Sequence, residues 1–236
     1  MYRMVWFATN FVGPYFESGV TQGQRLKVLE VGSYDDRYNG AYRGVFSDGR
    51  IEYTGLDMVP GPSVDLVLPN PYDWSTIPDD HYDVVISGQA FEHIEFFWVT
   101  LAEMVRVLKP NGLMCIIAPA AYDEHRHPVD CYRFSTDAMV AMANYTGLKI
   151  LHAHTNCAPA KGTPLFGGNR AAWYGTRLVD SILIAEKPYA GGIKFPDLST
   201  YKCTPLPHEA LRSTFVPYHS KNIFRRLCNF ICSLFV

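Results

Sequence analysis

The chain has 236 residues, of which 48% are hydrophobic and 19% are charged, so its composition suits one sizeable globular domain and excludes wholesale disorder. With 21 basic and 23 acidic residues its net charge is −2, which excludes an overall basic surface for nucleic acid. The six cysteines form no Cys-x-x-Cys pair, which indicates reduced thiols in a cytoplasmic protein rather than a disulfide framework or a zinc site. We also expect no secretory signal and no transmembrane segment, which would need an apolar run of ~20 residues.

The first predicted elements surround a glycine turn. Residues 26–31 are an apolar, β-rich run that stops at Gly32, as expected of a strand buried on both faces in a parallel sheet. Gly32 lets the backbone turn without a Cβ. A helix over 39–46 and a second strand over 52–56 follow, and this strand ends at Asp57. Strand, glycine turn, helix, strand and terminal acid together predict a nucleoside site, in which the acid accepts hydrogen bonds from the ribose hydroxyls.

The glycine content of this turn narrows the choice of nucleoside. The dinucleotide fingerprint requires three glycines, whereas this turn has one, so a pyrophosphate is disfavoured. The acid that precedes the turn, Glu30, suits a ligand that carries an ammonium and a sulfonium group instead.

Strands and helices continue to alternate beyond Asp57. The patterns predict strand 63–68, strand 82–87, helix 97–108, strand 113–118, helix 137–145, strand 148–154 and strand 179–186. We expect residues 110–112 (Pro-Asn-Gly) to end the first of these helices. Thr136 or Ser135 should cap the second helix, and Gly147 should end it. This alternation predicts an α/β fold with a seven-stranded, mostly parallel sheet.

Four motifs in this order resemble those of the class I S-adenosylmethionine (SAM)-dependent methyltransferases, specifically the type-11 group. They are Val-Leu-Glu-Val-Gly-Ser (28–33), Tyr-Thr-Gly-Leu-Asp (53–57), Phe-Glu-His (91–93) and Arg-Val-Leu-Lys-Pro-Asn-Gly (106–112). The resemblance covers residues 25–188. It implies a Rossmann-like, doubly wound sheet whose last strand is antiparallel, with S-adenosyl-L-methionine as the cofactor.

In open α/β sheets, ligands bind beyond the carboxyl ends of the strands. The expected cofactor-binding residues are therefore Glu30, Gly32, Ser33, Tyr34, Asp57, Met58, Asn70, Tyr72, Ser87 and Gln89. Asp57 is the strongest candidate because a carboxylate accepts charge-assisted hydrogen bonds from both ribose hydroxyls, although it also suits a helix N-cap. The family pattern has glycine at the positions of Tyr34 and Asp36, so this loop departs from it.

The acceptor side is predicted from the residues after the fourth and fifth strands. Methyl transfer needs an aligned acceptor and often a base, for which the candidates are His93, His127 and Asp130. The run His125–Phe134 resembles a signature of methyltransferases found with surface-polysaccharide synthesis genes. This resemblance implies O-methylation of a sugar or glycan hydroxyl, with a glycosyltransferase as a possible partner. The spacing of His125, His127 and Asp130 permits a divalent metal, but we assign no metal ligand.

Other acceptors and other functions stay open at this point. Residues 70–72 (Asn-Pro-Tyr) resemble an amine-methyltransferase motif, but they follow the third strand instead of the fourth, which argues against an amine acceptor. The alternatives are a methyltransferase for another small molecule or lipid, a catalytically silent binding module and, least favoured, a nicotinamide-dependent enzyme.

Three segments lie outside the central pattern. The resemblance implies that residues 1–24 cap the cofactor site, whereas a packing arm against the sheet fits them equally well. Residues 25–188 form the methyltransferase domain, in which the long stretch 155–177 is a substrate-facing loop or a surface excursion. Residues 189–236 form a C-terminal extension. Its last part, 221–236, has apolar residues at helical spacing and predicts an amphipathic helix that docks on the body or on a partner chain, so that an oligomer can form.

Overall fold

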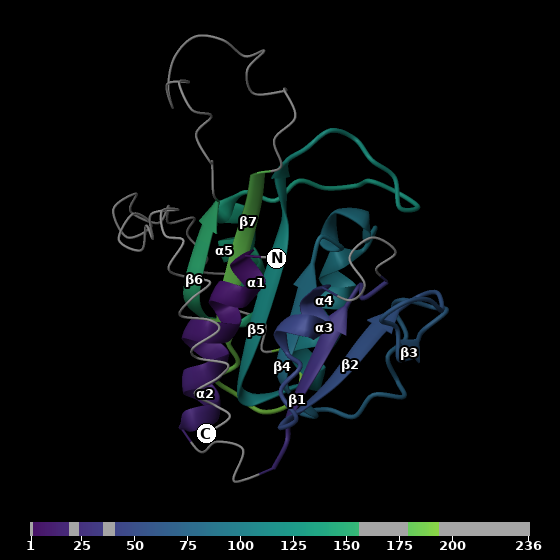
Figure 1. Cartoon of the computed structure of the whole chain (residues 1–236). Helices are drawn as coiled ribbons and strands as arrows, with labels where there is room; N and C mark the ends of the chain where they lie inside the picture. The colour runs from purple at the N-terminus through teal and green to yellow at the C-terminus, as the bar shows by residue number, and fades with distance from the viewer. Residues whose placement is uncertain (1, 19–23, 35–40, 156–178, 194–236) are drawn as a thin grey trace. The chain divides into compact units, whose positions relative to one another are not determined.

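The structure, a computed structural model, describes residues 2–18, 24–34, 41–155 and 179–193 (Figure 1). The predicted substrate loop, apart from residue 155, and the predicted C-terminal helix lie outside the described residues. Among the helices within these ranges, none has both the length and the apolar character needed to cross a lipid bilayer.

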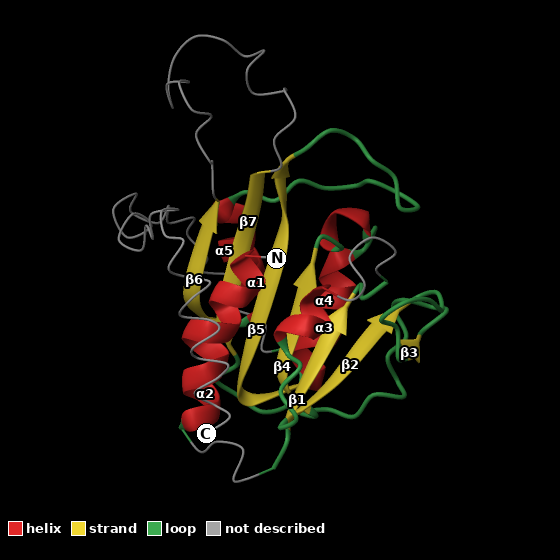
Figure 2. Cartoon of the chain, in the orientation of Figure 1, coloured by secondary structure: helices red, strands yellow, loops and turns green. Residues whose placement is uncertain are grey.

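The core of the fold is one mixed sheet (Figure 2). Its strands are β1 (Leu26–Val31), β2 (Ile51–Asp57), β3 (Leu66–Val67), β4 (Tyr82–Gly88), β5 (Leu108–Ala121), β6 (Lys149–Thr155) and β7 (Val179–Glu186). They are arranged in the order β3-β2-β1-β4-β5-β7-β6, in which neighbours from β3 to β5 pair in parallel and β7 pairs antiparallel with both β5 and β6. The predicted doubly wound, mostly parallel seven-stranded sheet with an antiparallel last strand is therefore confirmed.

Helices cover both faces of this sheet. They are α1 (Tyr2–Phe7), the π-helical η1 (Ala8–Val12), α2 (Gly13–Glu17), α3 (Ala41–Val45), the 3₁₀ turn η2 (Phe91–His93), α4 (Phe97–Val107) and α5 (Thr136–Thr146). Consecutive β1 residues face opposite layers, because Leu29 packs in the core beneath α4 and α5 while Val28 packs in the core with α1. This two-sided burial explains why the strands read as continuous apolar runs.

The N-terminal segment packs against the sheet. Met4, Phe7 and Val12 are buried in the same hydrophobic cluster as Val28 of β1 and Val84 of β4. This contact is the one expected of a packing arm, and it anchors the segment on the face opposite α4 and α5.

Two predicted boundaries are wrong. Residues 110–112 do not end α4, because the helix stops at Val107 and β5 begins at Leu108. The tripeptide instead forms an irregularity within β5, where the pairing with β4 shifts register and Asn111 has a φ of +62°. The third strand is also shorter than the predicted 63–68, since Ser63 has a φ of +66° and lies in a turn.

The predicted caps of α5 are confirmed. The Ser135 hydroxyl accepts a hydrogen bond from the Ala138 amide at the start of the helix. Gly147 has a φ of +69° and caps the other end, with its amide donating to Ala143 and Asn144 carbonyls. A left-handed residue at this position is usually glycine.

The chain connectivity places the candidate site. Along the sequence the strands first extend the sheet from β1 to β3, and β4 then returns to the other side of β1. The strand order therefore reverses between β1 and β4, and ligands in such sheets bind at the carboxyl ends of the strands beside this reversal.

Candidate functional site

The turn after β1 touches the turn after β4. Gly32 has a φ of +77°, and a Cβ placed on it would lie 2.4 Å from the Cβ of Ala90. Its amide and the amide of Ser33 donate to the Leu56 carbonyl at 3.0 and 3.1 Å, which fixes the turn against β2. A side chain at position 32 is thus opposed by both the backbone conformation and the neighbouring turn.

Replacing Gly32 with alanine should therefore lower the free energy of unfolding by about 2–3 kcal/mol, from left-handed strain and from overpacking. Gly49→Ala is the matched control, because nothing lies within 4 Å of the added Cβ at that position. We expect that control to change stability by no more than about 0.5 kcal/mol. Urea unfolding of both variants measures the difference, and equal stabilities would show that the close approach at Gly32 is not restrictive.

Asp57 joins the loops that follow β1 and β2. Its Oδ2 accepts a hydrogen bond from the Tyr34 amide at 3.0 Å, and its Oδ1 accepts one from the Met58 amide at 2.7 Å. No helix follows β2 before β3, so the alternative of a helix N-cap does not describe this residue. The Val59 amide also lies 3.5 Å from Oδ1. A carboxylate offers about four lone-pair sites, so acceptor capacity remains for a ligand, most of it on Oδ2.

Two further predicted cofactor residues are buried at this edge. Glu30 is only 5% exposed, and its carboxylate accepts a hydrogen bond from the Tyr53 hydroxyl of β2. The Ser33 hydroxyl is buried without a hydrogen-bond partner in the part of the chain that the structure describes, and it lies close to Gly55, where an added Cβ would approach it to 2.8 Å. Ser33 therefore packs into β2, and Glu30 is held in place beneath the turn.

Two predicted contacts after β4 have structural partners. The Ser87 hydroxyl donates to the Val31 carbonyl at 2.9 Å and ties β4 to β1. The side-chain Nε2 of Gln89 donates to Asp180 Oδ1 at 3.0 Å, and the backbone of Gln89 has a φ of +58°. Burial raises the pKa of Asp180, and the bond from Gln89 opposes this rise.

Apolar side chains of the loops near Asp57 face solvent. Tyr34 and Met58 are 46% and 41% exposed, which is high for large hydrophobic residues. Asn70 and Tyr72 lie further along, after β3, where the Asn70 side chain accepts a hydrogen bond from the Tyr72 amide at 3.1 Å. The Tyr72 hydroxyl in turn accepts a hydrogen bond from the amide of Phe96, so the structure links Tyr72 to the start of α4.

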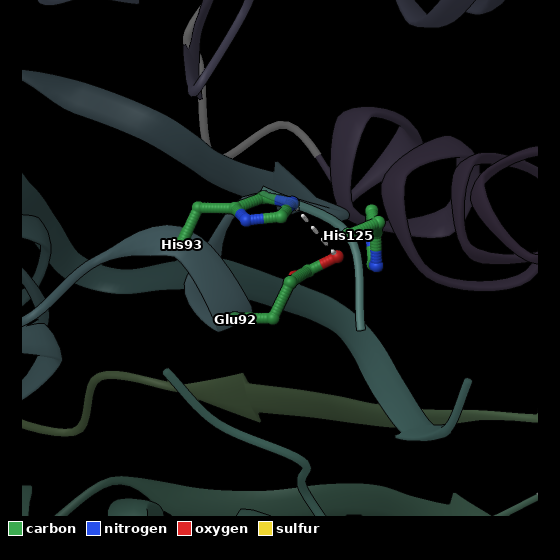
Figure 3. A group of neighbouring side chains, drawn as sticks. All are labelled: Glu92, His93 and His125. Atoms are coloured by element: carbon green, nitrogen blue, oxygen red, sulfur yellow. Dashed lines mark ion pairs between the residues drawn. The ribbon is translucent and has the colours of Figure 1, made fainter. Parts of the chain in front are cut away.

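Glu92, His93 and His125 form a second group at the carboxyl edge (Figure 3). Glu92 and His93 belong to η2, which follows β4, and His125 belongs to the loop after β5. Glu92 is fully buried, and among the described residues its carboxyl group has no hydrogen-bond partner beyond an interaction with its own amide. Burial raises the pKa of Glu92 to about 7, although the Arg133 charge opposes this rise.

The orientation of the His93 ring is set by a backbone carbonyl. Its Nδ1 lies 2.6 Å from the Val129 oxygen, and because a carbonyl can only accept, Nδ1 carries the proton. Nε2 then presents its lone pair, 3.8 Å from Glu92 Oε1. Burial lowers the pKa of His93, which favours the neutral imidazole.

Asp130 organises the loop after β5. Its carboxylate accepts two hydrogen bonds from the Arg133 guanidinium and one, at 2.8 Å, from the His125 amide. The bonds from Arg133 hold the pKa of Asp130 well below its ordinary range. The exposed His127 ring lies 5.7 Å, centroid to centroid, from that of His93. The structure thus brings all three predicted catalytic residues into one loop region, with Asp130 engaged in an ion pair.

Glu92 and Tyr42 were not predicted as site residues. Glu92 belongs to the Phe-Glu-His motif, in which an acid next to a histidine directly after a strand could have indicated a site residue. Tyr42 belongs to α3 and reaches over the end of β4, so that a Cβ on Gly88 would meet its ring at 2.4 Å. Burial raises the pKa of Tyr42, with Glu30 adding to the shift. This contact joins distant segments, and no local pattern indicates it.

Comparisons with known proteins agree with this geometry. Residues 39–116 match a family model described as a methyltransferase domain. A SAM-dependent methyltransferase from Archaeoglobus fulgidus superposes with a TM-score of 0.53 at 14% identity, over 79% of this chain and 100% of that chain. The chain has a methyltransferase fold.

Two further solved structures show that this fold serves different acceptors. A Burkholderia thailandensis 1,6-didemethyltoxoflavin-N1-methyltransferase, with S-adenosylhomocysteine bound, gives a TM-score of 0.50 at 15% identity over 79% of this chain and 88% of that chain. The DszA carbon methyltransferase gives a TM-score of 0.51 at 13% identity, over 75% of this chain and 52% of that chain. No curated protein sequence matches the chain. The family match and these structures support S-adenosylmethionine as the cofactor of the methyltransferase fold described here.

Proposed function

We propose that the chain is a SAM-dependent O-methyltransferase that acts on a hydroxyl group of a sugar or glycan. The observation that carries the proposal is the position of Asp57. Its carboxylate accepts a hydrogen bond from the Tyr34 amide, in the turn that begins at Gly32, beside the point between β1 and β4 where the strand order reverses. The imidazole and carboxylate groups of His93 and Glu92 follow β4 at the same edge.

The residues near Asp57 fit this cofactor. The acceptor capacity that remains on the Asp57 carboxylate suits the ribose hydroxyls. The exposed Tyr34 and Met58 side chains offer apolar surface for a purine. The absence of a Cβ at Gly32 keeps the turn narrow, and the Glu30 carboxylate beneath it supplies negative charge for a cationic ligand. When bound, the cofactor supplies an electrophilic methyl group on a sulfonium.

The acceptor side offers a proton acceptor. His93 presents its Nε2 lone pair because its Nδ1 proton is held by Val129. A neutral imidazole in this orientation can take the proton of an alcohol, which is otherwise a poor nucleophile. Asp130 is a weaker base because Arg133 stabilises its charged form, so we assign it the positioning of the His125 loop. His127, exposed beside His93, is proposed to contact the acceptor.

The choice of a sugar rests on the run His125–Phe134 and its resemblance to methyltransferases of surface-polysaccharide synthesis. A glycosyltransferase that makes the acceptor, and a cytoplasmic location, belong to the same proposal. So does the division into an N-terminal segment (1–24), a methyltransferase domain (25–188) and a C-terminal extension (189–236) through which an oligomer forms.

Incubation of the purified chain with SAM and a panel of glycosides and nucleotide sugars tests the proposal. We expect S-adenosylhomocysteine and a sugar product heavier by one methyl group, both measured by mass spectrometry. Parallel reactions contain lipid and non-sugar small-molecule acceptors. Methylation confined to those acceptors would contradict the sugar assignment, and SAM binding without turnover on any acceptor would favour a silent binding module.

A further inference from the structure

The group of Glu92, His93 and His125 contains a buried carboxyl group that accepts no hydrogen bond from another of the described residues. Each of these residues offers one ligating atom, and the three atoms lie within 4.8 Å of one another. The Glu92 side chain is fully buried, points toward the two imidazoles in Figure 3 and has no hydrogen-bond donor from another residue. A buried carboxylate is ordinarily paired, hydrogen-bonded or bound to a metal. Within the described residues, Glu92 has no hydrogen-bond donor from another residue, and its contact with His93 at 3.8 Å is an ion pair only when the imidazole is protonated.

Both histidines are oriented as metal ligands are. His93 donates its Nδ1 proton to the Val129 carbonyl at 2.6 Å, and His125 Nδ1 lies 3.0 Å from the Asp123 carbonyl. Each ring is thereby held in the tautomer that leaves the Nε2 lone pair available. Metal-binding histidines almost always donate their other ring proton to a carbonyl or carboxylate in this way, which fixes the ring and raises its basicity.

The charges around the group also favour a cation. The Arg133 guanidinium is neutralised by two hydrogen bonds to the Asp130 carboxylate. The same carboxylate accepts the amide hydrogen bond of His125, so it anchors the loop that carries one ligand. The hydrogen bonds of Asp130 therefore hold the loop in position, and Glu92, instead of Asp130, supplies the acidic ligand.

We propose that Glu92, His93 and His125 bind one divalent transition-metal ion of the zinc type, at the carboxyl edge beyond β4 and β5. Two imidazoles and one carboxylate suit zinc and its first-row neighbours, whereas magnesium and calcium prefer oxygen ligands. Zinc binds such donors at about 2.0–2.2 Å, so the side chains must move inward from their separation here to complete the coordination. With the ion bound, the Nε2 lone pair of His93 is a ligand and is no longer the proton acceptor proposed above. Three protein ligands leave a fourth position open for water or for an acceptor hydroxyl, whose acidity the metal would raise.

The metal-binding test uses the full chain without an affinity tag, freed of metal by a chelator. Calorimetric titration with Zn²⁺ should give a saturable site of one ion per chain, and millimolar Mg²⁺ should not displace it. Glu92→Gln keeps the side-chain shape and removes the charge, and His125→Ala lies on a loop, so both variants should fold. We expect each to weaken Zn²⁺ binding at least about tenfold. His81→Ala is the matched control, since His81 contacts Lys27 instead of the group, and its affinity should stay within about twofold of the original.

Cobalt titration distinguishes this site from binding by thiols, because the chain also has six cysteines. We expect visible Co²⁺ absorption without a thiolate charge-transfer band. The Glu92→Gln variant should lose this absorption. A stoichiometric site that both variants leave unchanged, a thiolate band, or no saturable binding would overturn the inference. The inference does not rest on the proposed function, since the metal alone is the probe and neither cofactor nor acceptor is present.

Discussion

Replacing Asp57 with alanine is expected to weaken SAM binding by about two to four orders of magnitude, because each charge-assisted hydrogen bond to a ribose hydroxyl contributes about 1.5–3 kcal/mol. The variant also removes the acceptor for the Tyr34 and Met58 amides, which bond the carboxylate at 3.0 and 2.7 Å. Calorimetric titration of SAM into the full chain measures the affinity.

Two further variants separate ligand contacts from loop structure. Asp57→Asn retains an oxygen acceptor for the loop amides but loses the charge, so its affinity should fall between those of the original chain and Asp57→Ala. Asp79→Asn changes an exposed acid of the β3–β4 connection that pairs with Arg106, and its SAM affinity should be unchanged. Thermal melts verify that each variant folds. Original affinity in a folded Asp57→Ala variant would remove Asp57 from the cofactor site.

Replacing His93 with alanine is expected to lower turnover by about two to four orders of magnitude, which is the usual contribution of a positioned base. The SAM affinity should stay within about threefold, since His93 lies after β4 at the acceptor side, whereas Asp57 is the last residue of β2. Rates of S-adenosylhomocysteine release with a sugar acceptor, together with calorimetry, test both statements.

Variants at three other positions serve as comparisons and controls for the turnover of His93→Ala. Asp130→Asn weakens the pair with Arg133 and loosens the loop, so we expect a smaller loss of turnover, about tenfold, again exceeding the loss of SAM affinity. His127→Ala should likewise lower turnover more than affinity. His81→Ala lies at the opposite end of β4 and should leave both unchanged. Turnover of His93→Ala within twofold of the original would move the chemistry away from this histidine.

Local patterns were sufficient for most of the fold. The runs that form β1, β4 and β7 are mainly apolar, with few charged residues, because most of each strand is buried on both faces, and the sequence shows this pattern. The stop of α4 was misplaced, because the Pro-Asn-Gly at 110–112 is accommodated as an irregularity in β5, where the Asn111 amide donates to the Lys187 carbonyl at 2.7 Å. That hydrogen bond joins segments far apart in the chain, and the hydrophobic periodicity of a single segment cannot predict such a contact.

The same distinction applies to the site. The turn at Gly32 and the strand end at Asp57 follow from local chemistry and can be predicted from the sequence, and their contact with the cofactor stays a prediction. The Ser87 hydroxyl donates to the Val31 carbonyl because position 87 is buried between strands, a contact that no local pattern indicates, and its predicted contact with the cofactor stays a prediction. The burial of the Glu92 carboxyl group, which accepts no hydrogen bond from another described residue, depends on the packing of η2 against the loop that carries His125, and so on residues from two separate segments.

A crystal structure of the chain with S-adenosylhomocysteine is the most direct measurement of the central claim. The predicted result is a nucleoside beside the Gly32 turn, with both ribose hydroxyls within hydrogen-bonding distance of the Asp57 carboxylate. A complex in which the nucleoside lies elsewhere, or in which Asp57 has no contact with the ribose, would contradict the proposed binding site.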